Sequence, residues 1–122
     1  MIIDHCRDKA EFKEFFEAYP MDDGIMDFDF IYRNPNTFLF YDELTKELKA
    51  YMSFYKDESE RLFMCGASCR KNLLDNINAI IKVCNAFDND IYADTDKKEA
   101  KICLLKAGFK KIDDNLFVRY KR

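Results

Sequence analysis

The order in which two hydrophobic periodicities alternate along the chain is the feature that most limits its fold. Three strand-like runs follow one another at Thr37–Tyr41, Ala50–Tyr55 and Leu62–Cys65, and the first two predict an antiparallel hairpin. An amphipathic helix over about 72–87 comes next, and a brief strand at Asp90–Asp94 follows it. The alternation predicts a sheet flanked by helices, in the order strand, helix, helix, three strands, helix, strand, helix, two strands.

The first part of this order carries a helix-boundary motif. Ile2–Cys6 predicts a short strand, and Asp8 with Glu11 predicts the capped start of a helix. Pro20 ends that helix, because proline cannot continue it and restricts the residue before it. Residues 21–33 predict a short helix or an irregular cover.

The last part repeats the capping pattern, with Asp96 followed by Glu99. Gly108 comes after the apolar side of this helix and predicts a left-handed residue that ends it. Phe109 is expected to pack back on the last turn. Two short strands then close the chain, Lys110–Ile112 and Leu116–Tyr120.

Composition and charge limit the domain count and the partners. The chain has 122 residues, 48% of them apolar, so we expect a single domain over 1–122 with its own core. No run approaches the ~18 apolar residues of a membrane span, so we expect no membrane partner. Residues 1–60 carry a net charge of −8 and residues 61–122 one of +5. The basic half is too sparse to predict a nucleic-acid partner.

The cysteines indicate the compartment. There are five, an odd number, and they stand inside apolar runs, which favours reduced and buried thiols. With no Cys-x-x-Cys pair and His5 as the one histidine, the spacing predicts neither zinc nor a Cys–His nucleophile. The start lacks the basic region of a secretory signal. We therefore expect a cytoplasmic protein. The residue usage is typical of proteins encoded by AT-rich genomes, such as those of phages and low-GC bacteria. If a phage encodes the chain, we expect it in the host cytoplasm.

The segment Ala100–Ile112, with a helix that ends in Gly108-Phe109, resembles the GNAT superfamily of N-acetyltransferases. The order of elements over about 37–122 resembles that family too, and residues 1–36 are compatible with its opening strand and helices. The resemblance implies a GNAT-like α/β (α+β) fold, with a central, mostly antiparallel sheet flanked by helices. It also implies acetyl-CoA as the cofactor and transfer of its acetyl group to an amine of a small molecule or a protein.

The family's cofactor site lies on a central strand that splays from its neighbour and on the start of the helix that follows. Pantetheine binds the strand backbone, and the pyrophosphate binds N–H groups at the helix start. The resemblance implies a cofactor site made of Phe63, Met64, Cys65, Ser68, Cys69, Arg70, Lys71, Asn72 and Leu73. The family's phosphate loop reads roughly Arg-x-x-Gly-x-Gly/Ala, whereas Ser68–Leu73 contains no glycine. Arg70 and Lys71 would hold phosphates by charge instead, or lie solvated in the first turn.

The family's leaving-group acid, commonly a tyrosine on the last helix, would fall at Leu104. Leucine has no proton to donate, so an active enzyme would need an acid from elsewhere in the chain. Tyr92 and Asp94 are the candidates that the chain offers nearby, with Cys103 as a further substitute.

An acidic segment, Asp22–Asp29, corresponds to the region that covers the acceptor amine in the family. Asp27 and Asp29 would suit a cationic amine. A solvent-facing acidic cover is the alternative interpretation.

Two functions remain open. One is a small N-acetyltransferase, with its activity retained, weakened or lost. The other is a non-catalytic binding or structural protein of GNAT fold, plausibly phage-encoded, because a fold does not determine a function. The exposed edge of the terminal hairpin also offers a surface on which a homodimer could form.

Overall fold

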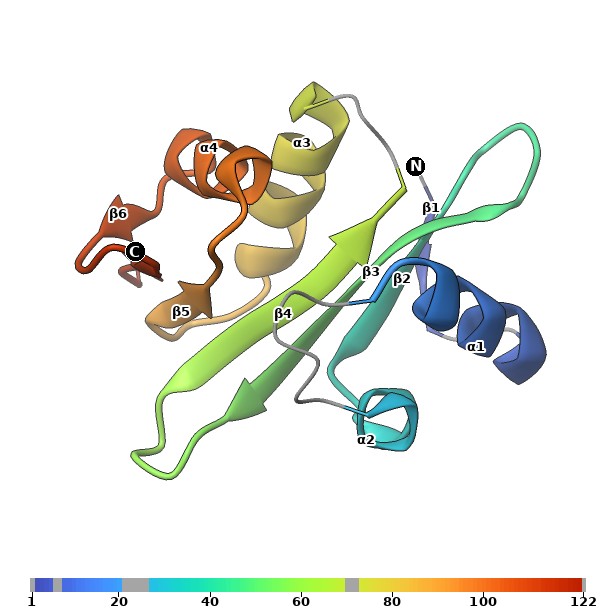
Figure 1. The fold of residues 1–122 in the computed structure, drawn as a ribbon, viewed down its shortest axis with the longest axis horizontal. Coiled ribbons are helices and arrows are strands. Elements are labelled where there is room, and N and C mark those ends of the chain that lie inside the picture. Colours follow the sequence, from blue (N-terminus) through green and yellow to red (C-terminus); the bar gives the residue numbers. More distant parts are fainter. Residues whose placement is uncertain (1, 6–7, 21–26, 70–72, 122) are drawn as a thin grey trace. The chain divides into compact units, whose positions relative to one another are not determined.

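The computed structural model describes residues 2–5, 8–20, 27–69 and 73–121, except for the side chain of residue 73, and every structural statement below concerns these residues. The elements are β1 (Ile2–Asp4), α1 (Lys9–Ala18), α2 (Phe28–Arg33), β2 (Thr37–Tyr41), β3 (Leu48–Lys56), β4 (Leu62–Ser68), α3 (Leu73–Cys84), β5 (Ile91–Asp94), α4 (Lys98–Lys106), β6 (Lys110–Lys111) and β7 (Leu116–Arg119) (Figure 1).

In the described residues, the seven strands form a mostly antiparallel sheet in the order β1-β2-β3-β4-β5-β7-β6, and four helices accompany it. The predicted mixed α/β class and the predicted order of elements are confirmed. The chain groups into two compact units, which are described in turn. The first contains Met1–Phe54 and Cys65–Cys69, and the second contains Tyr55–Met64 and Arg70–Arg122.

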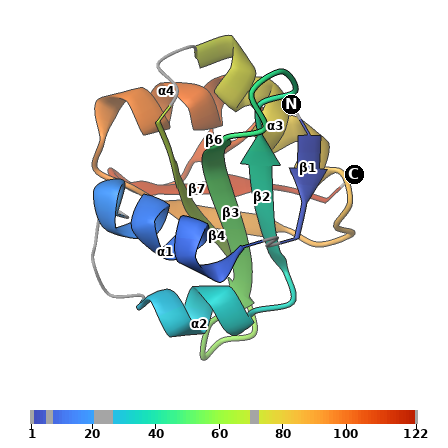
Figure 2. The same cartoon turned by 90° about the vertical axis from the view of Figure 1, so that its right-hand side faces the viewer.

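The first unit packs its two helices against its strands in one shared core, and Figure 2 shows α1 and α2 together on the near side of the strands. Asp8 caps α1 as predicted, because its carboxylate accepts hydrogen bonds from the N–H groups of Ala10 and Glu11. The buried residues of this core come from both helices and both strands: Phe12, Phe15, Ile31, Leu39, Tyr41, Leu48 and Tyr51.

The predicted hairpin of β2 and β3 is confirmed as antiparallel, but β3 is longer than Ala50–Tyr55. The register shifts where Phe40 pairs with Ala50 while Tyr41 pairs with Leu48. Lys49 is therefore the extra residue of a β-bulge, and a bulge re-aims the side chains around it.

The strand predicted over Leu62–Cys65 is too short, because β4 continues through Gly66 to Ser68. A Cβ atom at Gly66 would collide with the carbonyl oxygen of Tyr51. The glycine is needed here for the close approach of two strand backbones, and not for a turn.

The second unit pairs β4 with β5 in parallel over Leu62–Met64, and pairs β5 with β7 antiparallel. The register places Ile91, Ala93, Phe117 and Arg119 on one face, where all four are buried. Arg119 donates hydrogen bonds to the Cys84 carbonyl oxygen at 3.5 Å and to the Asn85 side chain at 2.5 Å, next to the end of α3. This face therefore packs on the helix side of the unit, where α3 and α4 lie side by side (Figure 1).

The predicted glycine cap of α4 is confirmed. Gly108 has φ 100°, its N–H donates to Leu105, and the N–H of Phe109 donates to Leu104. This bond pattern is a Schellman motif, and the burial of both Phe109 and Leu104 supplies its apolar contact.

Other predicted boundaries are corrected. Asp96 does not cap α4: the N-cap is Lys97, which makes no side-chain capping bond, and the Lys97 N–H donates to Thr95 Oγ1. The helix predicted over 72–87 ends at Cys84, and two turn residues follow it. Three strands end earlier than predicted, β1 at Asp4, β6 at Lys111 and β7 at Arg119. Among the described residues, no helix has both the length and the apolar character to cross a bilayer.

Candidate functional site

Three aromatic rings form a row across neighbouring strands of the second unit. The rings of Tyr55 and Phe63 stack with centroids 5.9 Å apart, and those of Phe63 and Tyr92 lie 5.6 Å apart. Phe63 and Tyr92 are register partners in the parallel pair, so they project from the same face of the strands. Tyr92, one of the predicted catalytic candidates, is half-buried in this row.

A guanidinium group lies on two of these rings. The Cζ atom of Arg61 is 5.3 Å from the centroid of Phe63 and 5.2 Å from that of Tyr92. Both distances fall within the range of cation–π attraction. Tyr92 therefore has the ring of Phe63 and the guanidinium of Arg61 as neighbours.

Asp57 holds Arg61 in place. Its Oδ2 atom accepts from Nε of Arg61 at 3.0 Å and pairs with Nη2 at 2.9 Å, while Oδ1 accepts the backbone N–H groups of Ser59 and Arg61. Desolvation acts to raise the pKa of Asp57, but the hydrogen bonds and charge of Arg61 outweigh it and leave that pKa below its usual value.

Sequence reasoning missed the role of Arg61. Arg61 comes directly before β4, two residues before Phe63 and four after Asp57. This spacing is the signal that the sequence offers for the arrangement.

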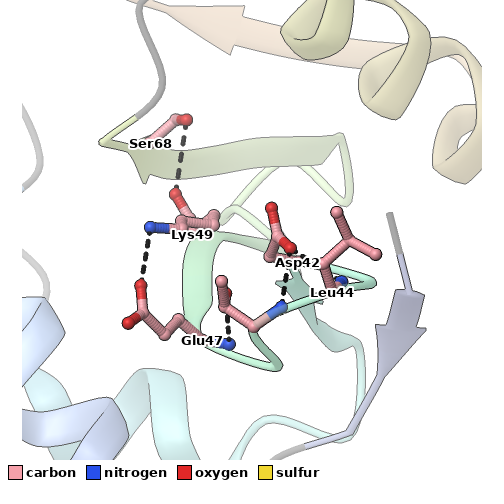
Figure 3. A network of polar contacts seen from close by, with 6 residues as sticks. Asp42, Leu44, Glu47, Lys49 and Ser68 are labelled. Carbon is pink, nitrogen blue, oxygen red and sulfur yellow. Dashed lines mark hydrogen bonds and ion pairs between the residues drawn. The ribbon is translucent and has the colours of Figure 1, made fainter.

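The carboxyl end of β4 is bound to the bulge of β3 in the first unit (Figure 3). The carbonyl oxygen of Lys49 accepts from the hydroxyl of Ser68 at 3.4 Å and from the N–H of Cys69 at 3.0 Å. The N–H of Cys69, predicted to face a pyrophosphate, is thus occupied by the protein's own backbone in this structure.

The same bulge carries a charged group. The ammonium of Lys49 lies 3.0 Å from the carboxylate of Glu47, whose hydrogen bond and charge raise the pKa of Lys49 (Figure 3). The turn before it is held by Asp42, which accepts the N–H groups of Leu44 and Thr45.

Three more of the predicted cofactor residues have structural contacts. Phe63 is part of the ring row. The sulfur atom of Met64 lies 3.9 Å from the thiol sulfur of Cys84. The thiol of Cys65 donates to the carbonyl oxygen of Ser53 at 3.7 Å. Arg70, Lys71, Asn72 and the side chain of Leu73 lie outside the described residues. The predicted phosphate loop therefore stays a prediction.

The other candidate acids differ in exposure. Leu104, where the resemblance would place an acid but which has no proton to donate, is buried. Burial also raises the pKa of the Cys103 thiol beside it, which makes ionisation harder. Asp94 is exposed at the end of β5, where it pairs in register with Leu116.

The two predicted acceptor carboxylates lie at the start of α2. The side chain of Asp27 accepts the N–H of Phe30 at 2.8 Å and caps the helix, and Asp29 stands in its first turn. Both are exposed, and Asp27 already has a structural task. Residues 22 and 23 of the acidic segment lie outside the described residues.

None of the described cysteines, Cys65, Cys69, Cys84 and Cys103, is part of a disulfide bond. Burial raises the pKa of Cys84 to about 11. In the part of the chain that the structure describes, no three His, Cys, Asp or Glu side chains are grouped to hold a metal ion.

Comparison of the chain with protein-family models, with curated proteins and with solved structures gives no significant match.

Proposed function

We propose that the chain is a small N-acetyltransferase of GNAT type, which moves the acetyl group of acetyl-CoA to an amine. The observation that carries this proposal is the parallel unit β4–α3–β5 within a mostly antiparallel sheet. The helix that ends at Gly108 and hands the chain to the last hairpin supports it. These are the features of this chain that resemble the family.

In this proposal each group has a defined task. The amine attacks the thioester carbonyl, and the phenol of Tyr92 protonates the leaving thiolate. The backbone of β4 binds pantetheine, and Arg70 with Lys71 bind the phosphates in place of a glycine loop. Solvent takes the proton of the amine.

A non-catalytic binding protein of the same fold is the second candidate. Two observations favour it: the residue at the usual acid position, Leu104, is buried and apolar, and the N–H of Cys69 is taken by the Lys49 carbonyl. Such a protein would keep the fold and lose the turnover.

Thiol release from acetyl-CoA separates the two candidates. With a panel of small amines and lysine peptides as acceptors, the enzyme produces free CoA in an amount that depends on acceptor and enzyme concentration. A binding protein produces none above the protein-free rate.

A double variant checks the phosphate assignment. Arg70→Ala with Lys71→Ala weakens acetyl-CoA binding by about tenfold or more, since each charged contact contributes roughly 1.5–3 kcal/mol. Lys110→Ala with Lys111→Ala removes the same charge from β6 and serves as the matched control. Equal affinity of both double variants would refute the assignment.

A further inference from the structure

We propose that Arg61 is a positioning residue for Tyr92 in the acetyl transfer. The inference rests on the proposed function and assigns a task that the resemblance does not contain. Arg61 contacts no reacting atom in this assignment and acts through the orientation of the tyrosine ring.

The guanidinium of Arg61 is itself held in a fixed position. Asp57 binds its guanidinium through Nε and Nη2 and also accepts its backbone N–H. Glu60, the residue before it, adopts a positive φ of 64°, and the N–H of Glu60 donates to the Asp57 carbonyl. The tip of the β3–β4 hairpin therefore presents the guanidinium in one place.

The fixed guanidinium of Arg61 in turn restrains the ring of Tyr92. The ring of Tyr92 contacts Phe63 at a centroid distance of 5.6 Å and the Arg61 guanidinium at 5.2 Å. Both contacts come from the neighbouring strand and its hairpin, so together they limit the tilt of the ring. The phenolic oxygen stands at the end of that ring and moves with it.

The orientation of the Tyr92 phenol matters for the chemistry of the transfer. In the transfer, the amine nitrogen bonds to the acetyl carbon, the carbon–sulfur bond breaks, and the phenol gives its proton to the thiolate. Solvent takes the proton of the new ammonium and returns one to the phenolate. Proton transfer needs the donor within hydrogen-bond reach of the sulfur, so a freely tilting ring slows this step.

A double-mutant cycle tests the proposal. The variants are Arg61→Gln, Tyr92→Phe and their combination, with steady-state acetyl-CoA turnover as the measurement. We expect Arg61→Gln to lower kcat by about tenfold while the KM for acetyl-CoA stays within about twofold, because misplacement affects the reacting geometry more than binding. In the Tyr92→Phe background, Arg61→Gln has no further effect.

Two further variants act as controls. Arg61→Lys keeps the cation and recovers part of kcat, although lysine cannot pair bidentately with Asp57. Lys110→Gln removes a comparable cation, whose ammonium lies 5.9 Å from the ring centroid of Tyr120 in the same unit, and leaves kcat unchanged.

The possible outcomes separate the positioning role of Arg61 from the proposed acetyltransferase activity. An equal loss from Arg61→Gln in both backgrounds shows a purely structural role and overturns the inference while the proposed function stands. A wild-type protein that binds acetyl-CoA and shows no turnover with any acceptor overturns both.

Discussion

Gly66 shows how one residue can have a task that differs from the one its sequence context indicates. It lies inside β4, where a Cβ atom would collide with the carbonyl oxygen of Tyr51. Its neighbours Cys65 and Ala67 pack against the core of the first unit. The glycine thus lets two strands approach and lets the flanking side chains reach that core.

Substituting this glycine tests the interpretation. Gly66→Ala lowers the free energy of unfolding by about 1–3 kcal/mol, because the added methyl must push two backbones apart. Ala67→Gly at the next position costs only about 0.5–1 kcal/mol, the usual cost of glycine inside an element. Urea denaturation measures both. A Gly66→Ala protein as stable as wild type would show that the strands do not approach as described.

Asp57 makes stability depend on pH at the acid end. Its pKa in the fold lies below the unfolded value of 3.8, because the hydrogen bonds and charge of Arg61 outweigh desolvation. The contribution of Asp57 is therefore present above that value and is lost as the pH falls through the lower, folded pKa. The difference in Tm between wild type and Asp57→Asn is constant above about pH 5 and shrinks below about pH 4. A difference that does not change with pH would contradict this account.

At the scale of elements, a buried polar network joins the end of α2 to β2 and β3. Ser53 is fully buried, accepts from the side-chain amide of Asn34 at 2.8 Å, and shares a hydrogen bond of 2.8 Å with Thr37. Thr37 in turn donates to the carbonyl oxygen of Ile31 in α2 at 2.7 Å. This closed arrangement fixes the helix end on the strands, since buried polar groups are costly when left unpaired.

Removing one member of this network costs more than its own hydrogen bond. Ser53→Ala leaves the amide of Asn34 without that acceptor and lowers stability by about 1–3 kcal/mol. Ser59→Ala, at an exposed turn position, stays within about 0.5 kcal/mol and is the matched control. Chemical denaturation of both variants provides the measurement, and equal stabilities would contradict the role of the network.

Element boundaries were predictable where the determinants are local. Asp8 caps α1 and Gly108 ends α4, because both motifs depend on neighbouring residues alone. Asp96 failed as a cap, since the helix begins two residues later and Thr95 accepts the N–H of Lys97. The bulge at Lys49 was not predictable, because it depends on how two strands align.

At the scale of the whole molecule, the order of elements and the mixed α/β class followed from the alternation of periodicities. The row of Tyr55, Phe63 and Tyr92 did not, because cross-strand register is set by packing between segments far apart in the sequence. The sequence singled out Tyr92 as a catalytic candidate. The ion pair of Arg61 and Asp57, which places the guanidinium over the Tyr92 ring, was found only in the structure. The role of Tyr92 in acid catalysis stays a prediction.

Calorimetric titration with acetyl-CoA and with free CoA is the most direct test of the proposed activity. Each catalytic task proposed above requires that the chain first bind this cofactor. We predict saturable binding of acetyl-CoA in the micromolar range, with free CoA as a competitor for the same site. The absence of heat at millimolar concentrations of both ligands would contradict the proposed acetyltransferase.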